Sequence, residues 1–319
     1  MKLYSKDALE RPVKEMSKSG RFVHSYIITG EKGTGKKTAA KYIAMAMLCD
    51  EKSACGQCRQ CRRILSGQHP DFITVPKDGR IYSVNGIREN VVEDSFTAPN
   101  DCDRKIYFLP DCDGWTDASQ DALLKITEDP PDHAYFIFTA VNKSSFLPTL
   151  ISRSMTFELP EASRESCAQA LRDTGNYTEQ QISSAVESFG GNIGRCIDFL
   201  EGDADLAKSA EAVKKAVEAI VSGDEYTLAA VLNSASSSRD EMRCVLEMLS
   251  RIVRDAASSR SGNDGFLGCS PSGAVRMAER IPVSRLLEMY DALYEASYRC
   301  TRNCNAQAAA AVLCGKLCR

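Results

Sequence analysis

The run YIITGEKGTGKKT near the amino terminus limits the fold of this chain more than any other stretch. A β-prone segment, Tyr26 to Thr29, precedes a glycine-rich loop and a long helical pattern, and the loop contains Gly30, Gly33, Gly35 and Lys36. This is the strand, loop and helix context of a P-loop, in which backbone N–H groups and a helix amino terminus face phosphate oxygens. The sequence therefore predicts a phosphate-binding loop within an α/β domain.

The residue that follows the P-loop lysine departs from the motif. A hydroxyl at this position binds Mg²⁺ in P-loop enzymes, whereas this chain has Lys37 there and Thr38 one place later. One residue turns the direction of a helical side chain by about 100°. We therefore expect Thr38 to point away from the metal position, which leaves one magnesium ligand missing.

A second magnesium ligand is missing after the apolar strand predicted for Ile106 to Leu109. P-loop ATPases end this strand with an aspartate that holds Mg²⁺, usually followed by a glutamate that orients the attacking water. Here the two positions hold Pro110 and Asp111. We expect no ATPase activity from the chain alone, and ATP or ADP binding is doubtful. The degenerate nucleotide site predicted from the sequence comprises Gly30, Gly33, Gly35, Lys36, Thr38 and Asp111.

The 14 cysteines of this 319-residue chain need an explanation. The amino terminus lacks the apolar core of a signal peptide, and no run reaches about 18 apolar residues. We therefore expect a cytoplasmic protein without a membrane segment, in which thiols stay reduced. The net charge of −3 gives no global field that would attract nucleic acid.

Four cysteines directly follow the P-loop helix: Cys49, Cys55, Cys58 and Cys61. Two CxxC steps supply the four thiolates that structural Zn²⁺ prefers. Burial as small hydrophobic side chains is the plainer interpretation, but the residues between the cysteines are mostly polar. A redox CxxC is the competing one, and it would not require four cysteines. The sequence favours a zinc module at 49–61.

A second set, Cys300, Cys304, Cys314 and Cys318, lies in pairs four residues apart on helical sequence. Two helices could present a four-thiolate site from these pairs. We favour core packing, because apolar residues interleave with the later pair and free cysteine buries readily. Whether these four bind a metal is not decided by the sequence.

The chain is long enough for two or three domains. Up to residue 160, apolar strand-like runs alternate with helical patterns, which predicts a parallel sheet covered by helices on both faces. Residues 161–205 predict a lid of three short helices, with a capping box at Thr178 and Gln181. Residues 206–319 predict an all-helical third domain. Two apolar helix faces mark it: Met242, Val245, Leu246, Leu249, Ile252 and Val253, and then Val283, Leu286, Leu287, Tyr290 and Leu293. The predicted strands are 26–29, 72–75, 106–109, 135–139 and 156–159, and the predicted lid helices are 163–173, 178–188 and 193–200.

Several stretches together resemble bacterial clamp-loader subunits of the AAA+ class. They are HSYIITGEKGTGKK, the four-cysteine insert, QHPDF at Gln68 to Phe72, KIYFLPDCD, DALLKITEDPP, and LPTLISRS at Leu147 to Ser154. The resemblance spans all three predicted domains, and it implies that the third, residues 206–319, is a collar that mediates oligomerisation. It points to the delta-prime subunits of DNA polymerase III, since the ATP-hydrolysing tau/gamma relatives keep both magnesium ligands that Lys37 and Pro110 replace here.

The resemblance implies a catalytic role for one arginine. Ser152-Arg153-Ser154 is similar to the family's Ser-Arg-Cys motif, whose arginine enters the ATP site of the adjacent motor subunit. A guanidinium suits this task because it is permanently charged and binds phosphate oxygens in bidentate fashion. Arg153 is therefore the expected arginine finger in trans, although Ser154 departs from the motif. The motor subunits also carry a sensor arginine where this chain has Gly194.

The implied function is that of an ATPase-defective, stationary subunit of a pentameric clamp loader within the DNA polymerase III holoenzyme. It would help to load the sliding clamp onto primed DNA. The implied partners are the tau/gamma and delta subunits, with the clamp and primer-template DNA reached through the complex. Two alternatives stay open: an active tau/gamma-like ATPase, in which Lys36 and Asp111 serve a shifted site, and a zinc-dependent nucleic-acid-binding module with a vestigial P-loop. Subunit order, DNA contacts and the oligomeric state of the isolated chain are not decided by the sequence.

Overall fold

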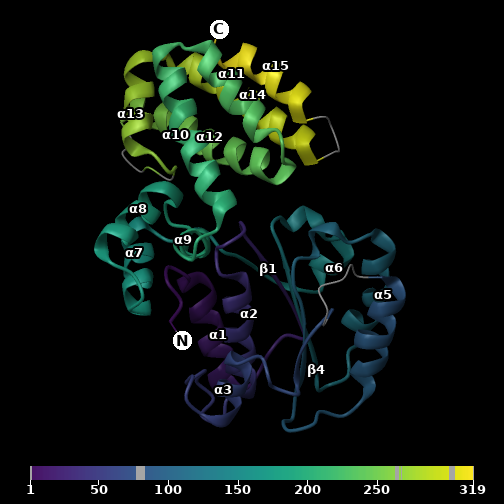
Figure 1. Ribbon diagram of the computed structural model, residues 1–319. Coiled ribbons are helices and arrows are strands. Elements are labelled where there is room, and N and C mark those ends of the chain that lie inside the picture. The colour runs from purple at the N-terminus through teal and green to yellow at the C-terminus, as the bar shows by residue number, and fades with distance from the viewer. Residues whose placement is uncertain (1, 77–82, 263–265, 267, 302–305, 319) are drawn as a thin grey trace. The chain divides into compact units, whose positions relative to one another are not determined.

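The computed structural model describes residues 2–76, 83–262, 266, 268–301 and 306–318 (Figure 1). The chain divides into two compact units, Met1–Ala162 and Ser163–Arg319. The separation of a lid at 161–205 from a collar at 206–319 stays a prediction. In the described residues, none of the helices is both long and apolar enough to cross a lipid bilayer.

The first unit is built on a five-stranded sheet whose strands are all parallel. The strand order is β2-β3-β4-β1-β5. All five strands lie where the sequence predicts them, within one residue at each end: β1 Ser25–Thr29, β2 Phe72–Thr74, β3 Lys105–Leu109, β4 Ala134–Ala140 and β5 Met155–Glu158.

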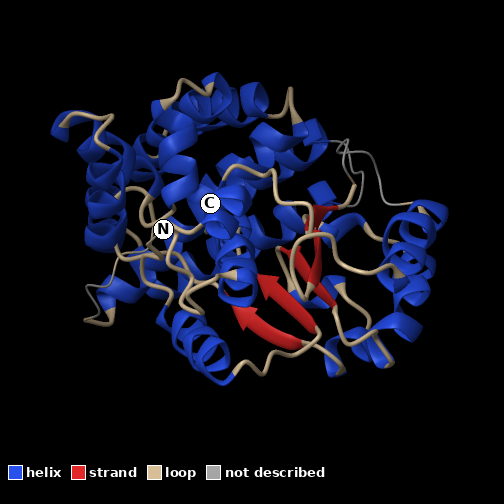
Figure 2. Cartoon of the chain, turned by 90° about the horizontal axis from the view of Figure 1, so that it is seen from below, coloured by secondary structure: helices blue, strands red, loops and turns tan. Residues whose placement is uncertain are grey.

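Helices cover both faces of this sheet, as Figures 1 and 2 show. Successive residues of a strand point to opposite faces, so Tyr26 and Ile28 pack on one side and Ile27 on the other. Both sides form buried apolar cores. The helices of this unit are α1 Asp7–Ser19, α2 Lys36–Leu48, α3 Arg59–Leu65, α4 Val84–Ile87, α5 Asp117–Glu128 and α6 Pro148–Ser152. The predicted fold class, a parallel α/β sheet followed by a helical region, is confirmed.

The parallel arrangement brings the carboxyl ends of the strands to one edge of the sheet, where ligands bind in open α/β folds. The P-loop leaves β1 at this edge, and Pro110 and Asp111 leave β3 at the same edge. Gly30 N donates to Val141 O at 3.1 Å, so the start of the P-loop is also tied to the end of β4.

The second unit consists of helices in the part of it that the structure describes. They share one buried core, and the six apolar residues predicted to form one helix face between Met242 and Val253 are all buried. The capping box of Thr178 and Gln181 is present as predicted. The helices are α7 Arg164–Thr174, α8 Glu179–Phe189, α9 Ile193–Leu200, α10 Ala204–Ser222, α11 Glu225–Ala235, α12 Arg239–Arg260, α13 Pro271–Arg280, α14 Val283–Thr301 and α15 Ala306–Cys318.

One prediction for this unit is wrong. Leu287 is predicted to share an apolar helix face with Leu286 and Leu293, but its side chain is 54% exposed, whereas Leu286 and Leu293 are buried. Neighbouring helical residues point about 100° apart, and this helix turns the side that carries Leu286 and Leu293 toward the core, so that Leu287 points away from it. Cys300 is buried and Cys314 is half-buried. Cys304 and the side chain of Cys318 lie outside the described residues.

Candidate functional site

The P-loop residues predicted from the sequence lie together between β1 and α2. Gly33 and Gly35 both have φ 89°, a backbone conformation that favours glycine. Gly30 could not carry a side chain, since an added Cβ would lie 2.6 Å from Leu159 O. Thr38 is half-buried in the first turn of α2. The loop therefore keeps the backbone shape that a phosphate cradle needs.

Lys36 is buried, with 7% of its surface exposed, and its ammonium group lies inside this loop. Nζ donates to Gly30 O at 2.6 Å and to Glu31 O at 3.0 Å. Burial lowers the pKa of Lys36, and the nearby carboxylates of Asp111, Asp113 and Glu31 act in the opposite direction. Both of these hydrogen bonds go to neutral carbonyl oxygens and neither goes to a carboxylate, so the ammonium can attract an anion bound in the loop.

Lys37 and Asp111 form an ion pair at the edge of the sheet. Lys37 Nζ lies 3.2 Å from Asp111 Oδ2, and both side chains are exposed. Asp111 adopts a left-handed backbone with φ 55°, and its N–H donates to Thr139 Oγ1 at 3.0 Å. A lysine ammonium therefore lies at the acid that follows Pro110, where hydrolysing P-loop proteins hold a magnesium ion.

Asp113 was not selected from the sequence, yet it organises the neighbouring loop. Its Oδ1 accepts hydrogen bonds from Val141 N at 2.7 Å and from Ser145 Oγ at 3.0 Å. These bonds fasten the segment after β3 to the segment after β4. An acid two places after Asp111 is the only signal in the sequence, and it does not distinguish this role from a surface residue.

Arg153 lies between α6 and β5, at the amino ends of the strands, whereas the P-loop lies at their carboxyl ends. Its guanidinium lies 3.1 Å from Glu128 Oε1 and donates to Thr149 O at 3.0 Å. β5 runs parallel to β1 with Tyr26 opposite Met155, so Arg153 precedes the amino ends of these strands. The P-loop follows the carboxyl end of β1. The structure thus separates Arg153 from the chain's own P-loop by the length of the sheet.

Ser154 is tied to the start of β1. Its Oγ donates to Leu150 O at 2.8 Å and lies 2.8 Å from Ser25 Oγ, which is therefore the donor in that pair. A hydroxyl is a stronger hydrogen-bonding group than a thiol. The serine at the third position of the motif thus has a matching hydroxyl partner on the neighbouring strand.

The four cysteines of the insert converge in space. The sulfur atoms of Cys49, Cys55, Cys58 and Cys61 all lie within 4.8 Å of one another. Cys49 Sγ is 3.6 Å from Cys55 Sγ and 3.9 Å from Cys58 Sγ. A tetrahedral zinc site with Zn–S bonds of about 2.3 Å places its sulfurs about 3.8 Å apart. The four thiols therefore fit a single metal ion such as zinc.

Backbone N–H groups already point at these sulfurs. Cys58 N donates to Cys55 Sγ at 3.3 Å, and Cys61 N donates to Cys58 Sγ at 3.4 Å. Burial raises the pKa of Cys49, but backbone hydrogen bonds outweigh it and hold that pKa at about 6. At Cys49 such bonds stabilise the thiolate, which is the form that binds metals, whereas burial raises the pKa of Cys58 and of Cys61. Ser17 of α1 braces the module through Ala46 O at 3.0 Å and Lys52 O at 2.7 Å.

The aspartate of QHPDF has a structural task that the sequence did not reveal. The Asp71 carboxylate is fully buried and accepts hydrogen bonds from the backbone N–H groups of Asn100, Asp101 and Cys102, at 2.6, 2.7 and 2.9 Å. Asn100 Nδ2 adds a fourth bond at 3.0 Å. Burial raises the pKa of Asp71, but these hydrogen bonds outweigh it and lower the pKa below its usual range.

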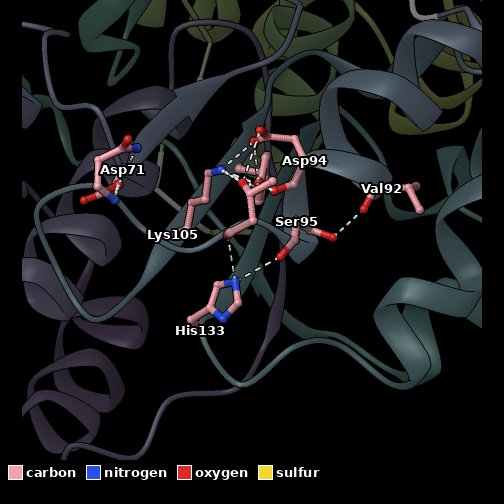
Figure 3. Close-up of polar contacts among 9 residues, drawn as sticks. Asp71, Val92, Asp94, Ser95, Lys105 and His133 are labelled. Atoms are coloured by element: carbon pink, nitrogen blue, oxygen red, sulfur yellow. Dashed lines mark hydrogen bonds and ion pairs between the residues drawn. The ribbon is translucent and has the colours of Figure 1, made fainter.

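A second polar cluster lies at the other end of this loop (Figure 3). Lys105 Nζ contacts Asp94 Oδ2 at 2.7 Å and Thr97 Oγ1 at 2.7 Å, while Tyr107 donates to Asp94 Oδ2 at 2.7 Å. His133 Nε2 lies 3.0 Å from the carbonyls of Ser95 and Thr97. The cluster borders a cavity of about 650 Å³ that the sequence did not predict. The charge of Lys105 is balanced by Asp94, so we assign the cluster a structural role.

Comparison with known proteins places these features in a family. Residues 5–163 match the family model described as "DNA polymerase III, delta subunit". The DNA polymerase III subunit delta' of Bacillus subtilis is 26% identical over 255 residues, which cover 77% of this chain and 75% of that protein. The subunit delta' of Escherichia coli is 26% identical over 275 residues, covering 84% and 80%. The subunit gamma/tau of Mycoplasma pneumoniae is 31% identical over 169 residues, covering 52% of this chain and 24% of that protein.

Proposed function

We propose a function from the family to which this chain belongs through residues 5–163, that of DNA polymerase III delta subunits. The chain acts as a delta-prime subunit of the clamp loader, which helps to place the sliding clamp on primed DNA. It does not hydrolyse ATP itself. Its contribution to the reaction is Arg153, which it donates to the ATP site of a neighbouring motor subunit.

The position of Arg153 carries this proposal. A strand rises about 3.3 Å per residue, so the five residues of β1 set Arg153 roughly 15 Å or more from the P-loop that follows the strand. The guanidinium therefore cannot reach a phosphate in the chain's own site. An arginine finger at the amino ends of the strands can act only in the ATP site of another subunit, which is the arrangement that the Ser-Arg motif predicts.

The ion pair of Arg153 with Glu128 is suited to exchange. The Glu128 side chain is 64% exposed, and ion pairs of this kind contribute only about 0–1 kcal/mol. A phosphate of a bound nucleotide on a neighbouring subunit, which accepts two parallel hydrogen bonds, would replace this carboxylate readily. Glu128 thus holds Arg153 in place until the partner site arrives.

The chain's own P-loop supports the absence of turnover. Pro110 and Lys37 stand at both positions that supply magnesium ligands, and the Lys37–Asp111 ion pair engages the remaining acid. These features favour the delta-prime function over an active tau/gamma-like ATPase.

The four-cysteine module holds a structural zinc ion in this proposal. Cys49, Cys55, Cys58 and Cys61 are the ligands, and they fix an insert whose other residues are largely polar. Zinc with four thiolates has no open position for chemistry. The module therefore shapes a surface beside the P-loop helix and takes no part in ATP turnover.

The second unit supplies the contacts to other subunits in this proposal, with a lid at 161–205 and a collar at 206–319 that assembles a hetero-pentamer. Helix α14 exposes Leu287, Tyr294 and Tyr298, and their spacing of seven and four residues places them on one face. Exposed aromatic and leucine side chains on one face are typical of protein interfaces. The partners are tau/gamma and delta subunits, with the clamp and primer-template DNA reached through the complex.

Reconstitution of the complete clamp loader with Arg153→Ala tests the proposal. We expect the complex to assemble as with the wild type, while DNA-stimulated ATP hydrolysis at the affected motor site falls by a factor on the order of 10³. Arg153→Lys should restore little of it, because an ammonium does not bind phosphate in bidentate fashion. Gel filtration and steady-state ATPase assays measure the two properties.

Arg11→Ala, an exposed arginine on α1, is the matched control and should leave both properties unchanged. Normal ATP turnover in a fully assembled Arg153→Ala complex would remove the role in trans. Turnover of ATP by the purified chain alone, lost in Lys36→Ala, would support the tau/gamma-like alternative instead.

A further inference from the structure

The magnesium ion that P-loop enzymes use does not fit this site. Lys37 occupies the position of the hydroxyl ligand, and its ammonium group lies 3.2 Å from Asp111, the first acid after β3. Pro110 offers neither charge nor a side-chain oxygen. A divalent cation at this place would meet a positive charge and would have to displace it from its carboxylate.

The phosphate cradle beside it is nevertheless intact. Gly33 and Gly35 keep the positive φ of 89° that turns the loop around a bound group, and α2 begins at Lys36 with its N–H groups toward the loop. Lys36 is buried with its ammonium on two neutral carbonyl oxygens. A buried cation that lies within a loop of backbone donors favours an anion.

We propose that this P-loop binds a diphosphate group, as in ADP, without a divalent cation, and that the ammonium of Lys37 supplies the positive charge that Mg²⁺ supplies in hydrolysing relatives. Binding requires Lys37 to turn from Asp111 toward the phosphates. The ion pair is exposed and therefore weak, and the Lys37 side chain is long enough to serve either partner.

The charges of the site favour a diphosphate over a triphosphate. Lys36 and Lys37 provide two positive charges, whereas Asp111 and Asp113 place two carboxylates after β3. In a P-loop the lysine reaches the β and γ phosphates and the acids after the strand face the γ phosphate. With no metal between them, these acids repel a third phosphate. The site thus binds a nucleoside diphosphate, the product of ATP hydrolysis, in preference to a triphosphate.

Calorimetric titration of the full chain with ADP, in EDTA and in millimolar Mg²⁺, tests this inference. We expect the same affinity in both buffers within a factor of about two, and weaker binding of ATP in EDTA. Lys37→Ala should weaken ADP binding in EDTA about tenfold, the usual effect of one charged hydrogen bond. Titration with inorganic pyrophosphate separates recognition of a free diphosphate from recognition of a nucleotide, and binding of either supports the site.

The double variant Lys37→Thr with Pro110→Asp restores both metal ligands, and its ADP affinity should rise about tenfold or more when Mg²⁺ is added. Lys18→Ala is the control, because this exposed lysine lies beside Ser17, which binds near the carboxyl end of α2, away from Lys37. The inference is overturned if neither ADP nor pyrophosphate binds in EDTA, if wild-type binding requires Mg²⁺, or if Lys37→Ala binds as the wild type does.

This inference goes beyond the proposed function, since a subunit that only donates Arg153 needs no nucleotide of its own. The two fail separately. Loss of nucleotide binding would leave the effect of Arg153→Ala on a neighbour untouched, and an inert Arg153 would leave the titrations of the isolated chain unchanged.

Discussion

At the scale of single residues, Asp71 shows how a buried charge can organise a loop. Its carboxylate accepts four hydrogen bonds from the segment 100–102, three of them from backbone N–H groups. That segment leads directly into β3, and β3 ends at Pro110. Asp71 therefore influences the position of Pro110 and Asp111 only indirectly, because it fixes the start of the strand that precedes them.

We predict that Asp71→Asn lowers the free energy of unfolding by about 2–3 kcal/mol, because the amide has one acceptor oxygen where the carboxylate has two. Since the folded pKa of Asp71 lies below the unfolded value, its contribution is present above pH about 4 and is lost as the pH falls through the folded pKa. Urea unfolding as a function of pH measures this. Asp132→Asn, at an exposed aspartate, should change little; an unaltered acid limb in Asp71→Asn contradicts the assignment.

At the scale of elements, the four-cysteine module joins the end of α2 to α3. The residues between the two helices are held by the sulfur contacts and by the hydrogen bond from Ser17 to Lys52 O. Cys61 and Cys49 are buried while Cys55 and Cys58 are half-buried, so the cluster closes the end of the apolar core beside α1. Metal binding should therefore order this corner and leave the sheet in place.

We predict that Cys58→Ser abolishes stoichiometric zinc binding, because three thiolates and a hydroxyl bind zinc much more weakly than four thiolates do. Elemental analysis of the purified protein measures this, and hydrogen exchange should show lost protection between residues 49 and 65 but not in β1 or β4. Cys102→Ser is the matched control, since Cys102 lies outside the cluster. Zinc retained by Cys58→Ser, or lost by Cys102→Ser, would point to a different ligand set.

A partly buried ion pair joins helix α9 to α12. It involves Arg195, the residue next to Gly194, which stands at the position of the sensor arginine of motor subunits. Arg195 lies next to Gly194 and contacts Glu247 Oε2 at 2.7 Å, and Arg251 contacts the other oxygen of the same carboxylate at 2.9 Å. Burial lowers the pKa of Arg195, but Glu247 outweighs it and raises that pKa. The arginine nearest to the sensor position is thus committed to holding α9 on α12.

We predict that Glu247→Gln destabilises the second unit by about 2 kcal/mol, since removal of the charge leaves two arginines without their carboxylate. Thermal unfolding followed by circular dichroism measures the change. Glu211→Gln removes the exposed pair with Lys215 and should leave the melting temperature nearly unchanged. Equal melting temperatures for the two variants would show that the Arg195 contact contributes no stability.

At the scale of the whole molecule, the two units have separate cores. Among the described residues, the apolar cluster of the second unit draws only on residues from Cys167 onward, and the two clusters on the sheet faces end at Leu159. Each unit also contains about half of the chain. Units with independent cores unfold independently when little links their stability.

We therefore predict two transitions in differential scanning calorimetry of the full chain. Addition of a zinc chelator should lower the midpoint of one transition, that of the first unit, and leave the other unchanged, because the four cysteines belong to the first core. Glu247→Gln should shift the other transition alone. A single transition that moves as one in both experiments would mean that the units unfold together.

Much of the fold was accessible from local patterns. Strands β1, β3 and β4 are buried throughout, whereas the edge strands β2 and β5 are partly exposed. All five are short apolar runs between turn residues, and this local pattern predicts their place without reference to the rest of the chain. The P-loop, the capping box at Thr178 and the four-cysteine module are likewise local signals. Leu287 was misplaced because adjacent apolar residues on a helix do not reveal which of them faces the core.

The sequence by itself determined the chemical inventory of this protein: a cradle with Lys36, four convergent thiols, and Lys37 and Pro110 where metal ligands belong. These follow from residue identity and short spacings, which fix chemistry before folding. Only the tertiary structure decided that Arg153 lies at the edge of the sheet opposite its own P-loop and that Lys37 pairs with Asp111. Lys37 and Asp111 are 74 positions apart in the sequence, and Arg153 is still farther from the P-loop. The geometry of these relations depends on the order and direction of the strands, which no local pattern encodes.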